Sequence, residues 1–282
     1  MSNISKLAFI DPSARLGNDI TIGPFCVVGP DVTLGDNCKL INNVTINGNT
    51  SIGRNNTFYA NSVIGEAPQD LKYKGSPTET VIGDNNVFRE NVTVHRGTEL
   101  DSARTVIGSN CLFMVGCHIA HDCIVEDNVI IGNDTQLAGH VTIQKGAVVT
   151  ALIGLHHFVT VGRYAYIGGL TPVRRDVPPF VKFSGDPNAC RGINEEGLKR
   201  NGFTPDDIVL IKKTYRKLYK KGVNLTEALE DILDKEITNE HVQFFCQAIA
   251  NTCKSPHARY KETLRKDQDE SKLNRKSFEI RQ

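Results

Sequence analysis

Residues 10–34 read IDPSARLGNDITIGPFCVVGPDVTL, and in this stretch an apolar side chain returns at every sixth position. The spacing continues to residue 64 and, after two interruptions, to residue 173. The apolar anchors are Ile10, Leu16, Ile22, Val28, Leu34, Leu40, Ile46, Ile52, Phe58, Ile64, Ile82, Phe88, Val94, Ile107, Phe113, Ile119, Val125, Ile131, Leu137, Ile143, Val149, Leu155, Val161, Ile167 and Val173. A period of six fits neither an amphipathic helix nor alternating strands of a meander, and it is typical of a β-helix built from hexapeptide repeats.

Each hexad is expected to form one short strand and its turn, and three hexads close one triangular coil. Coils then stack at the usual strand separation of about 4.8 Å. We therefore predict a mainly β fold, with a β-helix over residues 1–190. A small α-helical domain over 191–253 and a charged, flexible tail over 254–282 are expected to follow it.

The position two residues before each anchor also faces the axis, and it is usually small or apolar. Five of the eight cysteines fall there, namely Cys26, Cys38, Cys111, Cys117 and Cys123. Buried cysteine behaves as a small hydrophobe, so we expect packing thiols. The alternative is a metal cluster of Cys111, Cys117 and Cys123, which would lie on three faces of one coil.

Composition argues against several classes of protein. Lys and Arg number 33 against 32 Asp and Glu, so no global basic field points to a nucleic-acid partner. The first residues lack the apolar core of a secretory signal, and no stretch has the roughly 18 apolar residues of a membrane span. We expect a cytoplasmic protein with reduced cysteines and no membrane segment.

The two interruptions of the period are expected to be loops ejected from the stacked coils. They lie at Glu66–Glu79, where a loop insertion is expected near 66–80, and at Thr98–Ala103. Loops on a rigid scaffold commonly carry function.

The period ends after Asp176-Val177-Pro178-Pro179, and helical signals follow. Thr204-Pro205-Asp206-Asp207 is typical of a helix start, and Gly222 is expected to end that helix. Two further helices are expected around Leu225–Leu233 and Val242–Ile249. The first helix carries two basic stripes, which are either a solvated face or a docking surface for an acidic partner: Lys212, Arg216, Lys220 and Lys213, Lys217, Lys221.

Six of the eight histidines lie between residues 95 and 157, and none takes an inward position: His95, His118, His121, His140, His156 and His157. With 18 residues to a coil, His121 should stack on Gly139, and Asp122 on His140. A histidine oriented by a neighbouring acid can act as a general base, and a glycine N–H one coil away can stabilise an oxyanion. Two alternatives stay open: a zinc site using His118 and His121 with His95 or His140, as in a trimeric β-helix enzyme of the carbonic anhydrase type, and a ligand-binding scaffold without catalysis.

Several motifs together resemble the bacterial acyl-carrier-protein:UDP-N-acetylglucosamine O-acyltransferase family over residues 1 to about 253. They are Gln69-Asp70-Leu71-Lys72-Tyr73, His95-Arg96-Gly97-Thr98, His118-Ile119-Ala120-His121-Asp122-Cys123, Leu137-Ala138-Gly139-His140-Val141, Asp176-Val177-Pro178-Pro179 and Glu196-Gly197-Leu198-Lys199-Arg200. The resemblance implies a homotrimer of left-handed parallel β-helices with active sites between subunits, and no metal or cofactor. It implies transfer of an (R)-3-hydroxyacyl chain from acyl carrier protein to the glucosamine 3-hydroxyl, the first step of lipid A synthesis.

The resemblance also implies residue roles. His121 matches the general base, Asp122 its orienting acid and Gly139 the oxyanion donor. The matching substrate contacts are Asp70 and Lys72 in the sugar-nucleotide loop, the cleft histidines His118, His140 and His156, the acyl-length position Gly169, and the diphosphate contacts Asn194, Glu196 and Arg200. An open groove at Gly169 implies a long acyl chain.

Two positions depart from the family pattern: Asn201, where a second arginine is frequent, and His157, where glutamine is usual. The tail after Pro256 extends beyond the usual end of the family. The acidic acyl carrier protein gives the basic helix a natural partner. The related N-acyltransferase, acting on a UDP-3-O-acylglucosamine, is the alternative within the fold.

Overall fold

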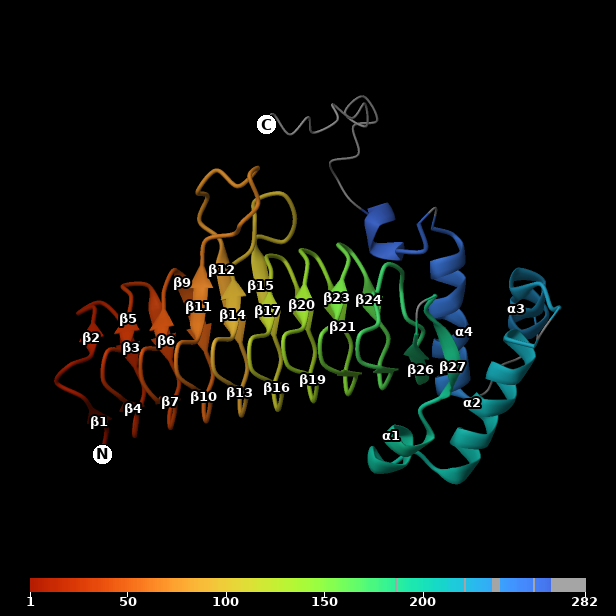
Figure 1. Cartoon of the computed structure of the whole chain (residues 1–282), viewed down its shortest axis with the longest axis horizontal. Coiled ribbons are helices and arrows are strands. Elements are labelled where there is room, and N and C mark those ends of the chain that lie inside the picture. Colours follow the sequence, from red (N-terminus) through yellow and green to blue (C-terminus); the bar gives the residue numbers. More distant parts are fainter. Residues whose placement is uncertain (186, 221, 235–238, 256, 265–282) are drawn as a thin grey trace.

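The computed structural model describes residues 1–264 apart from 186, 221, 235–238 and 256. A long three-sided stack of short strands, a left-handed parallel β-helix, occupies most of the chain, and helices lie at its C-terminal end (Figure 1). The anchors of the six-residue period lie on these strands, except Val173, which forms an isolated bridge with Leu155. The predicted fold class is confirmed.

Three sheets form the faces. The first contains β1 (Asn3–Ile4), β4 (Thr21–Ile22), β7 (Lys39–Leu40), β10 (Thr57–Phe58), β13 (Val87–Phe88), β16 (Leu112–Phe113), β19 (Ile130–Ile131), β22 (Val148–Val149), β25 (Tyr166–Ile167), β26 (Val181–Ser184) and β27 (Ala189–Ile193). The second contains β2 (Phe9–Ile10), β5 (Val27–Val28), β8 (Thr45–Ile46), β11 (Val63–Glu66), β14 (Thr93–His95), β17 (His118–Ile119), β20 (Gln136–Leu137) and β23 (Gly154–Leu155). The third contains β3 (Arg15–Leu16), β6 (Val32–Leu34), β9 (Asn49–Ile52), β12 (Glu79–Ile82), β15 (Arg104–Ile107), β18 (Ile124–Val125), β21 (Thr142–Ile143) and β24 (Thr160–Val161).

The register shows where the loops leave the stack. Neighbouring strands pair at a separation of 18 residues, as in the pairing of Thr21 with Lys39. Across the two interruptions the partners become Thr57 with Val87, and Val87 with Leu112. The additional residues form two loops that project side by side from one edge (Figure 1), joined by a hydrogen bond from the Lys74 N–H to Glu99 Oε1 at 2.9 Å.

The anchors fill the axis of the β-helix. Phe58, Phe88 and Phe113 stack at centroid distances of 4.7 Å in both pairs. The five cysteines predicted for the second inward position are buried, as expected. Burial raises the pKa of Cys117 and Cys123 to about 12, and their Sγ atoms donate to the carbonyls of Gly132 and Ala138. They therefore pack as neutral thiols.

The C-terminal region begins with an antiparallel hairpin, β26–β27, that the sequence did not predict. It leads into α1 (Glu195–Arg200), α2 (Pro205–Leu218), α3 (Leu225–Leu233) and α4 (Glu240–Cys253). Thr204 caps α2 as predicted, in a reciprocal capping box with Asp207. The helix ends at Leu218, earlier than predicted, and Gly222 lies in the turn that follows.

The basic stripes of α2 are partly used inside the molecule. Lys212 pairs with Glu195 at 2.5 Å, and Lys217 pairs with Asp231. Lys213 and Arg216 are exposed, whereas Lys220 lies beyond the helix and Lys221 lies outside the described residues.

Part of the expected tail packs on the β-helix. A short 3₁₀ turn, η1 (Tyr260–Leu264), follows α4. The Asp176 carboxylate accepts the Tyr260 N–H at 2.8 Å, and Arg259 donates to the Arg174 carbonyl at 3.0 Å. Residues 257–264 thus cover an edge of the β-helix, and the rest of the tail lies outside the described residues.

Among the helices described, none has the length and apolar character needed to cross a membrane.

Candidate active site

A cleft of about 1010 Å³ lies along the corner between the second and third sheets. One wall is the outer surface of the coils that carry the histidine cluster. The opposite wall is formed by both loops, through Asp70, Lys72 and Asp101, and by η1, through Lys261 and Leu264. This cover explains why His95 and His121 are buried although they point away from the axis.

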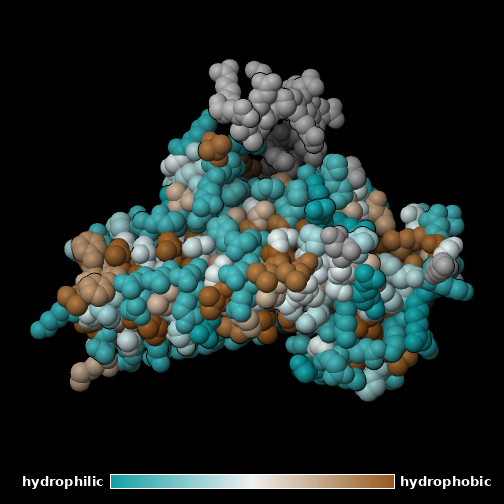
Figure 2. All heavy atoms as spheres, viewed as in Figure 1, coloured by the Kyte–Doolittle hydropathy of each residue, from teal (hydrophilic) through white to brown (hydrophobic). Residues whose placement is uncertain are grey.

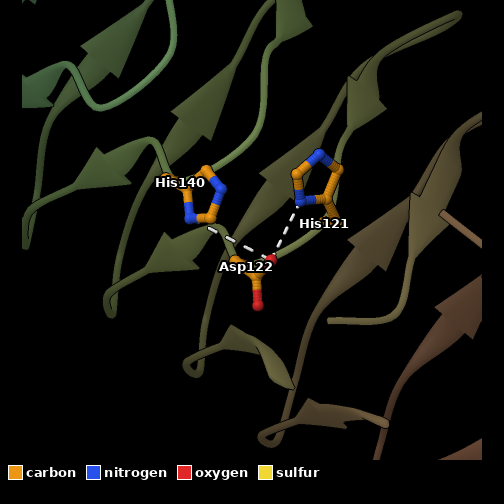
Figure 3. A group of neighbouring side chains, drawn as sticks. All are labelled: His121, Asp122 and His140. Carbon is orange, nitrogen blue, oxygen red and sulfur yellow. Dashed lines mark hydrogen bonds and ion pairs between the residues drawn. The ribbon is translucent and has the colours of Figure 1, made fainter. Parts of the chain in front are cut away.

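His121 and Asp122 form the centre of the cleft. The His121 Nδ1 lies 2.9 Å from Asp122 Oδ2, and both side chains are almost fully buried (Figure 3). The Thr98 N–H donates to the Asp122 carboxylate at 3.0 Å, and the Thr98 hydroxyl donates to Oδ2 at 2.6 Å. A carboxylate held in this way accepts a hydrogen bond from His121 Nδ1–H, so Nε2 is left as the basic nitrogen.

Gly139 lies one coil beyond His121 and directly against its ring. A Cβ atom at this position would fall 2.4 Å from His121 Cε1 and 2.6 Å from Nε2. The His140 N–H donates to the His121 carbonyl at 3.0 Å, whereas the Gly139 N–H makes no hydrogen bond with any residue that the structure describes. A backbone donor is therefore available beside the basic nitrogen.

Three site residues share one corner of successive coils. Asp122, His140 and Phe158 have φ values of 58°, 65° and 64°, in the left-handed region. Most other described corners with positive φ hold Asn, Asp or Gly, which adopt this conformation at lower cost. Among these three residues Phe158 adopts the conformation at the highest cost, as Leu152, Tyr164 and Leu170 do elsewhere in the β-helix.

His140 is fixed on three sides. Its Nδ1 lies 2.8 Å from Asp101 Oδ2, and its ring stacks on Phe158 at 4.3 Å. The His121 ring meets it edge to face at 5.1 Å (Figure 3). The predicted stacking of Asp122 near His140 is present, with His140 Nδ1 4.0 Å from Asp122 Oδ2.

Burial keeps the outer histidines neutral. It lowers the pKa of His118 to about 4, and neighbouring histidines add to this effect. It also lowers the pKa of His95 and His157. His118 Nδ1 lies 2.7 Å from the Thr93 hydroxyl, which fixes the ring. These rings can exchange hydrogen bonds with a ligand without carrying charge at neutral pH.

The structure brings together most of the residues singled out from the sequence. Those lining the cleft are His121, Asp122, Gly139, Asp70, Lys72, His118, His140 and His156. Four others do not line it: Gly169, Asn194, Glu196 and Arg200.

The four outlying residues lie nearer the C-terminal end. Gly169 follows β25, and the other three belong to α1 or its cap. The Asn194 side chain is buried as the N-cap, accepting the Gly197 N–H and donating to the Tyr164 carbonyl. Glu196 pairs with Lys199 at 3.2 Å on the surface. Within one chain, these residues are separated from His121.

Sequence reasoning missed three contributors: Thr98, Asp101 and Phe158. Thr98 and Asp101 belong to the second interruption of the period, which marked the loop without showing what it contacts. Phe158 follows His140 by 18 residues, which is one coil. This spacing could have placed Phe158 at the same corner as His140.

His121, Asp122 and His140 also offer one ligand atom each within 4.8 Å of one another, as a metal site requires. Two features favour an orienting role for Asp122. Its Oδ2 already accepts from His121 and Thr98, and His140 Nδ1 is engaged by Asp101. His118, which the zinc alternative pairs with His121, is hydrogen-bonded through Nδ1 to the Thr93 hydroxyl.

Two family models match the chain. The model described as "Udp N-acetylglucosamine O-acyltransferase; Domain 2" matches residues 176–256. The model "Bacterial transferase hexapeptide (six repeats)" matches residues 13–48, 31–66 and 104–139.

Relatives with the same description extend the match along the chain. An acyl-[acyl-carrier-protein]–UDP-N-acetylglucosamine O-acyltransferase of Aliivibrio salmonicida is 56% identical over 81% of this chain and 90% of its own length. For the protein of that name from Aliivibrio fischeri, the identity is 51% over 61% of this chain and 66% of the relative, so this match spans slightly less than two thirds of that protein. A crystal structure of a UDP-N-acetylglucosamine acyltransferase from Bacteroides fragilis superposes with a TM-score of 0.84 at 39% identity, covering 88% of this chain and 97% of that one.

Proposed function

Because this chain belongs to the family of acyl-[acyl-carrier-protein]–UDP-N-acetylglucosamine O-acyltransferases, we propose that the cleft at His121 carries out the acyl transfer for which the family is named. The chain is an acyltransferase with acyl carrier protein as the donor's carrier and UDP-N-acetylglucosamine as the acceptor. The acyl group is a (R)-3-hydroxyacyl chain, and the reaction is the first step of lipid A synthesis.

His121 is the general base. Its Nε2 removes the proton from the 3-hydroxyl of the sugar as the oxygen attacks the thioester carbonyl. The developing imidazolium is stabilised by Asp122, which accepts a hydrogen bond from its Nδ1–H. The Gly139 N–H donates to the carbonyl oxygen as it gains negative charge. Collapse of the intermediate expels the carrier thiolate, which takes the proton back from His121.

Substrate contacts are assigned to the walls of the cleft. Asp70 and Lys72 hold the sugar nucleotide, while His118, His140 and His156 contact the substrates near the reacting atoms. The location of these five residues around one cavity supports the assignment. Asn194, Glu196 and Arg200 contact the diphosphate, and Gly169 leaves space for a long acyl chain. These four residues are separated from His121 within one chain. This separation favours active sites that are shared between subunits of a trimer.

Acyl carrier protein docks on α2. The support is an exposed pair, Lys213 and Arg216, which makes no ion pair within the described part of the chain. An acidic carrier is electrostatically complementary to this surface. The visible face of the C-terminal helices is mainly hydrophilic (Figure 2).

The eight free cysteines favour a cytoplasmic setting.

The observation that carries the proposal is the buried His121–Asp122 pair with the Gly139 backbone beside it. His121→Ala is expected to lower kcat by at least about 100-fold, because the general base is lost. Turnover is measured by mass spectrometry of the acylated nucleotide, and gel filtration shows whether the variant keeps its assembly. Wild-type turnover in the folded variant would contradict the role.

The same assay separates the alternatives. UDP-N-acetylglucosamine is expected to be acylated, and a UDP-3-O-acylglucosamine with a free amine is expected not to be. The reverse preference would indicate the N-acyltransferase. Activity is expected to survive prolonged dialysis against EDTA. Loss on chelation, restored by zinc, would favour the metal site.

A further inference from the structure

The cleft contains a second histidine–carboxylate pair beside the first. Asp101 comes from the loop between β14 and β15, and its Oδ2 lies 2.8 Å from His140 Nδ1. This pair takes no part in the proton transfer proposed above. Its geometry nevertheless bears on the reacting histidine, because His140 lies against His121.

Two imidazoles lie near one carboxylate oxygen, and both could donate a hydrogen bond to it. Asp122 Oδ2 is 2.9 Å from His121 Nδ1 and 4.0 Å from His140 Nδ1. The same oxygen also accepts the Thr98 hydroxyl, so it has little remaining capacity. If the His140 Nδ1–H turned toward Asp122, it would weaken the bond that orients His121.

Asp101 removes this competition. By accepting the His140 Nδ1–H, it leaves His140 Nε2 as an acceptor. Stacking on Phe158, with ring planes 9° apart, keeps the imidazole from rotating. The two histidines therefore have the same tautomer, each fixed by its own carboxylate.

A cation from η1 lies near Asp101. The Lys261 ammonium lines the cleft, and its largest charge interaction is with Asp101. The charges of Glu126 and Asp176 also attract the Lys261 ammonium. Burial disfavours this charge and lowers the pKa of Lys261. Lys261 follows the region matched by the family model, which ends at residue 256.

We propose that Asp101 is a positioning residue of the acyl transfer, which fixes His140 as a hydrogen-bond acceptor for the substrate and reserves Asp122 for His121. The inference rests on the proposed function, since it assigns a task within that reaction. Asp101 is hydrogen-bonded to His140, through which it acts on the reaction.

A double-mutant cycle tests this claim: Asp101→Ala, His140→Ala and the double variant are compared with the wild type. Asp101→Ala is expected to lower kcat about 10-fold or more, because His140 and His121 lose their orientation. The KM values are expected to change less than about 3-fold, because Asp70 and Lys72 still hold the sugar nucleotide. In the His140→Ala background, the same substitution is expected to cause no further loss.

An equal loss in both backgrounds would overturn the proposal, as would wild-type kcat for Asp101→Ala. Asp101→Glu, which can restore the acceptor, is expected to recover part of kcat. If Asp101→Ala does not fold, as judged by its Tm, Asp101→Asn replaces it in the cycle. Asp31→Ala, at an exposed aspartate remote from the cleft, is the matched control. Acyl transfer by the wild type and this control establishes the proposed function independently of the outcome for Asp101.

Discussion

Gly139 shows how a single missing side chain shapes the site. The His121 ring occupies the space that a Cβ at residue 139 would need, with contacts of 2.4 and 2.6 Å to Cε1 and Nε2. These distances are far below van der Waals contact, so Gly139→Ala must displace the ring. We expect kcat to fall about 100-fold while Tm changes little, because the clash involves a side chain at the edge of the cleft. A folded Gly139→Ala enzyme with wild-type kcat would show that the ring does not need its observed position.

His118 should remain neutral throughout the physiological range. Its pKa of about 4 lies below the value of about 6.5 for an unfolded chain, so the unfolded state binds more protons between these pH values. Stability from this residue is fully present above pH 6.5 and is lost as pH falls toward 4. His118→Asn is therefore expected to lose less Tm than the wild type between pH 7 and pH 5.

A direct measurement checks the same prediction. In an NMR titration of the histidine ring protons, the His118 signal is expected to stay unchanged from pH 8 to about pH 5. A midpoint near 6.5 would mean that burial by the loops and by His95 does not desolvate the ring. The His118→Asn spectrum supplies the assignment.

Regular strands and helices could be predicted from the sequence, whereas the contacts made by the loops could not. The six-residue period located the strands, because every coil repeats one steric requirement at Ile119, Leu137 and their counterparts. Thr204 and Asp207 likewise marked the start of α2 through local hydrogen bonds. No such repeat indicates that Thr98 binds Asp122 or that Asp101 binds His140, because loop contacts depend on where the chain returns in space.

The attachment of η1 depends on a buried acid. Asp176 accepts the N–H groups of Thr160 and Tyr260 at 2.7 and 2.8 Å. Burial nevertheless raises its pKa to about 6, against the effect of these bonds. The folded state then binds more protons than the unfolded chain between about pH 4 and 6, so stability falls as pH rises through this window, by at most about 3 kcal/mol.

Asp176→Asn removes this titration. The variant is expected to equal or exceed the wild type in Tm at pH 7.5 and to show a smaller Tm change between pH 4.5 and 7.5. The opposite pattern, a variant destabilised at pH 7.5 but not at pH 4.5, would mean that the two N–H bonds outweigh desolvation. Hydrogen exchange at residues 257–264 shows whether η1 stays attached in each case.

At the scale of the whole molecule, the rigid stack separates two groups of proposed substrate contacts. The histidine cleft lies on the middle coils, whereas Arg200 and its neighbours lie on α1 at the C-terminal end. A stacked β-helix cannot bend enough to bring them together, because each coil is hydrogen-bonded to the next along all three faces. We therefore expect a second chain to supply one of the two groups to each substrate.

Subunit mixing tests this arrangement. His121→Ala and Arg200→Ala each remove one part of the proposed shared site, so each variant on its own is expected to have little activity. If the two variants are unfolded, mixed in equal amounts and refolded, random assembly leaves about a quarter of the sites with both residues intact, so about a quarter of wild-type activity should return. Mixing without unfolding is the control, because recovery of activity is expected only where new pairs of subunits form. If both residues act within one chain, no site in the mixture is complete and activity stays at the level of the separate variants.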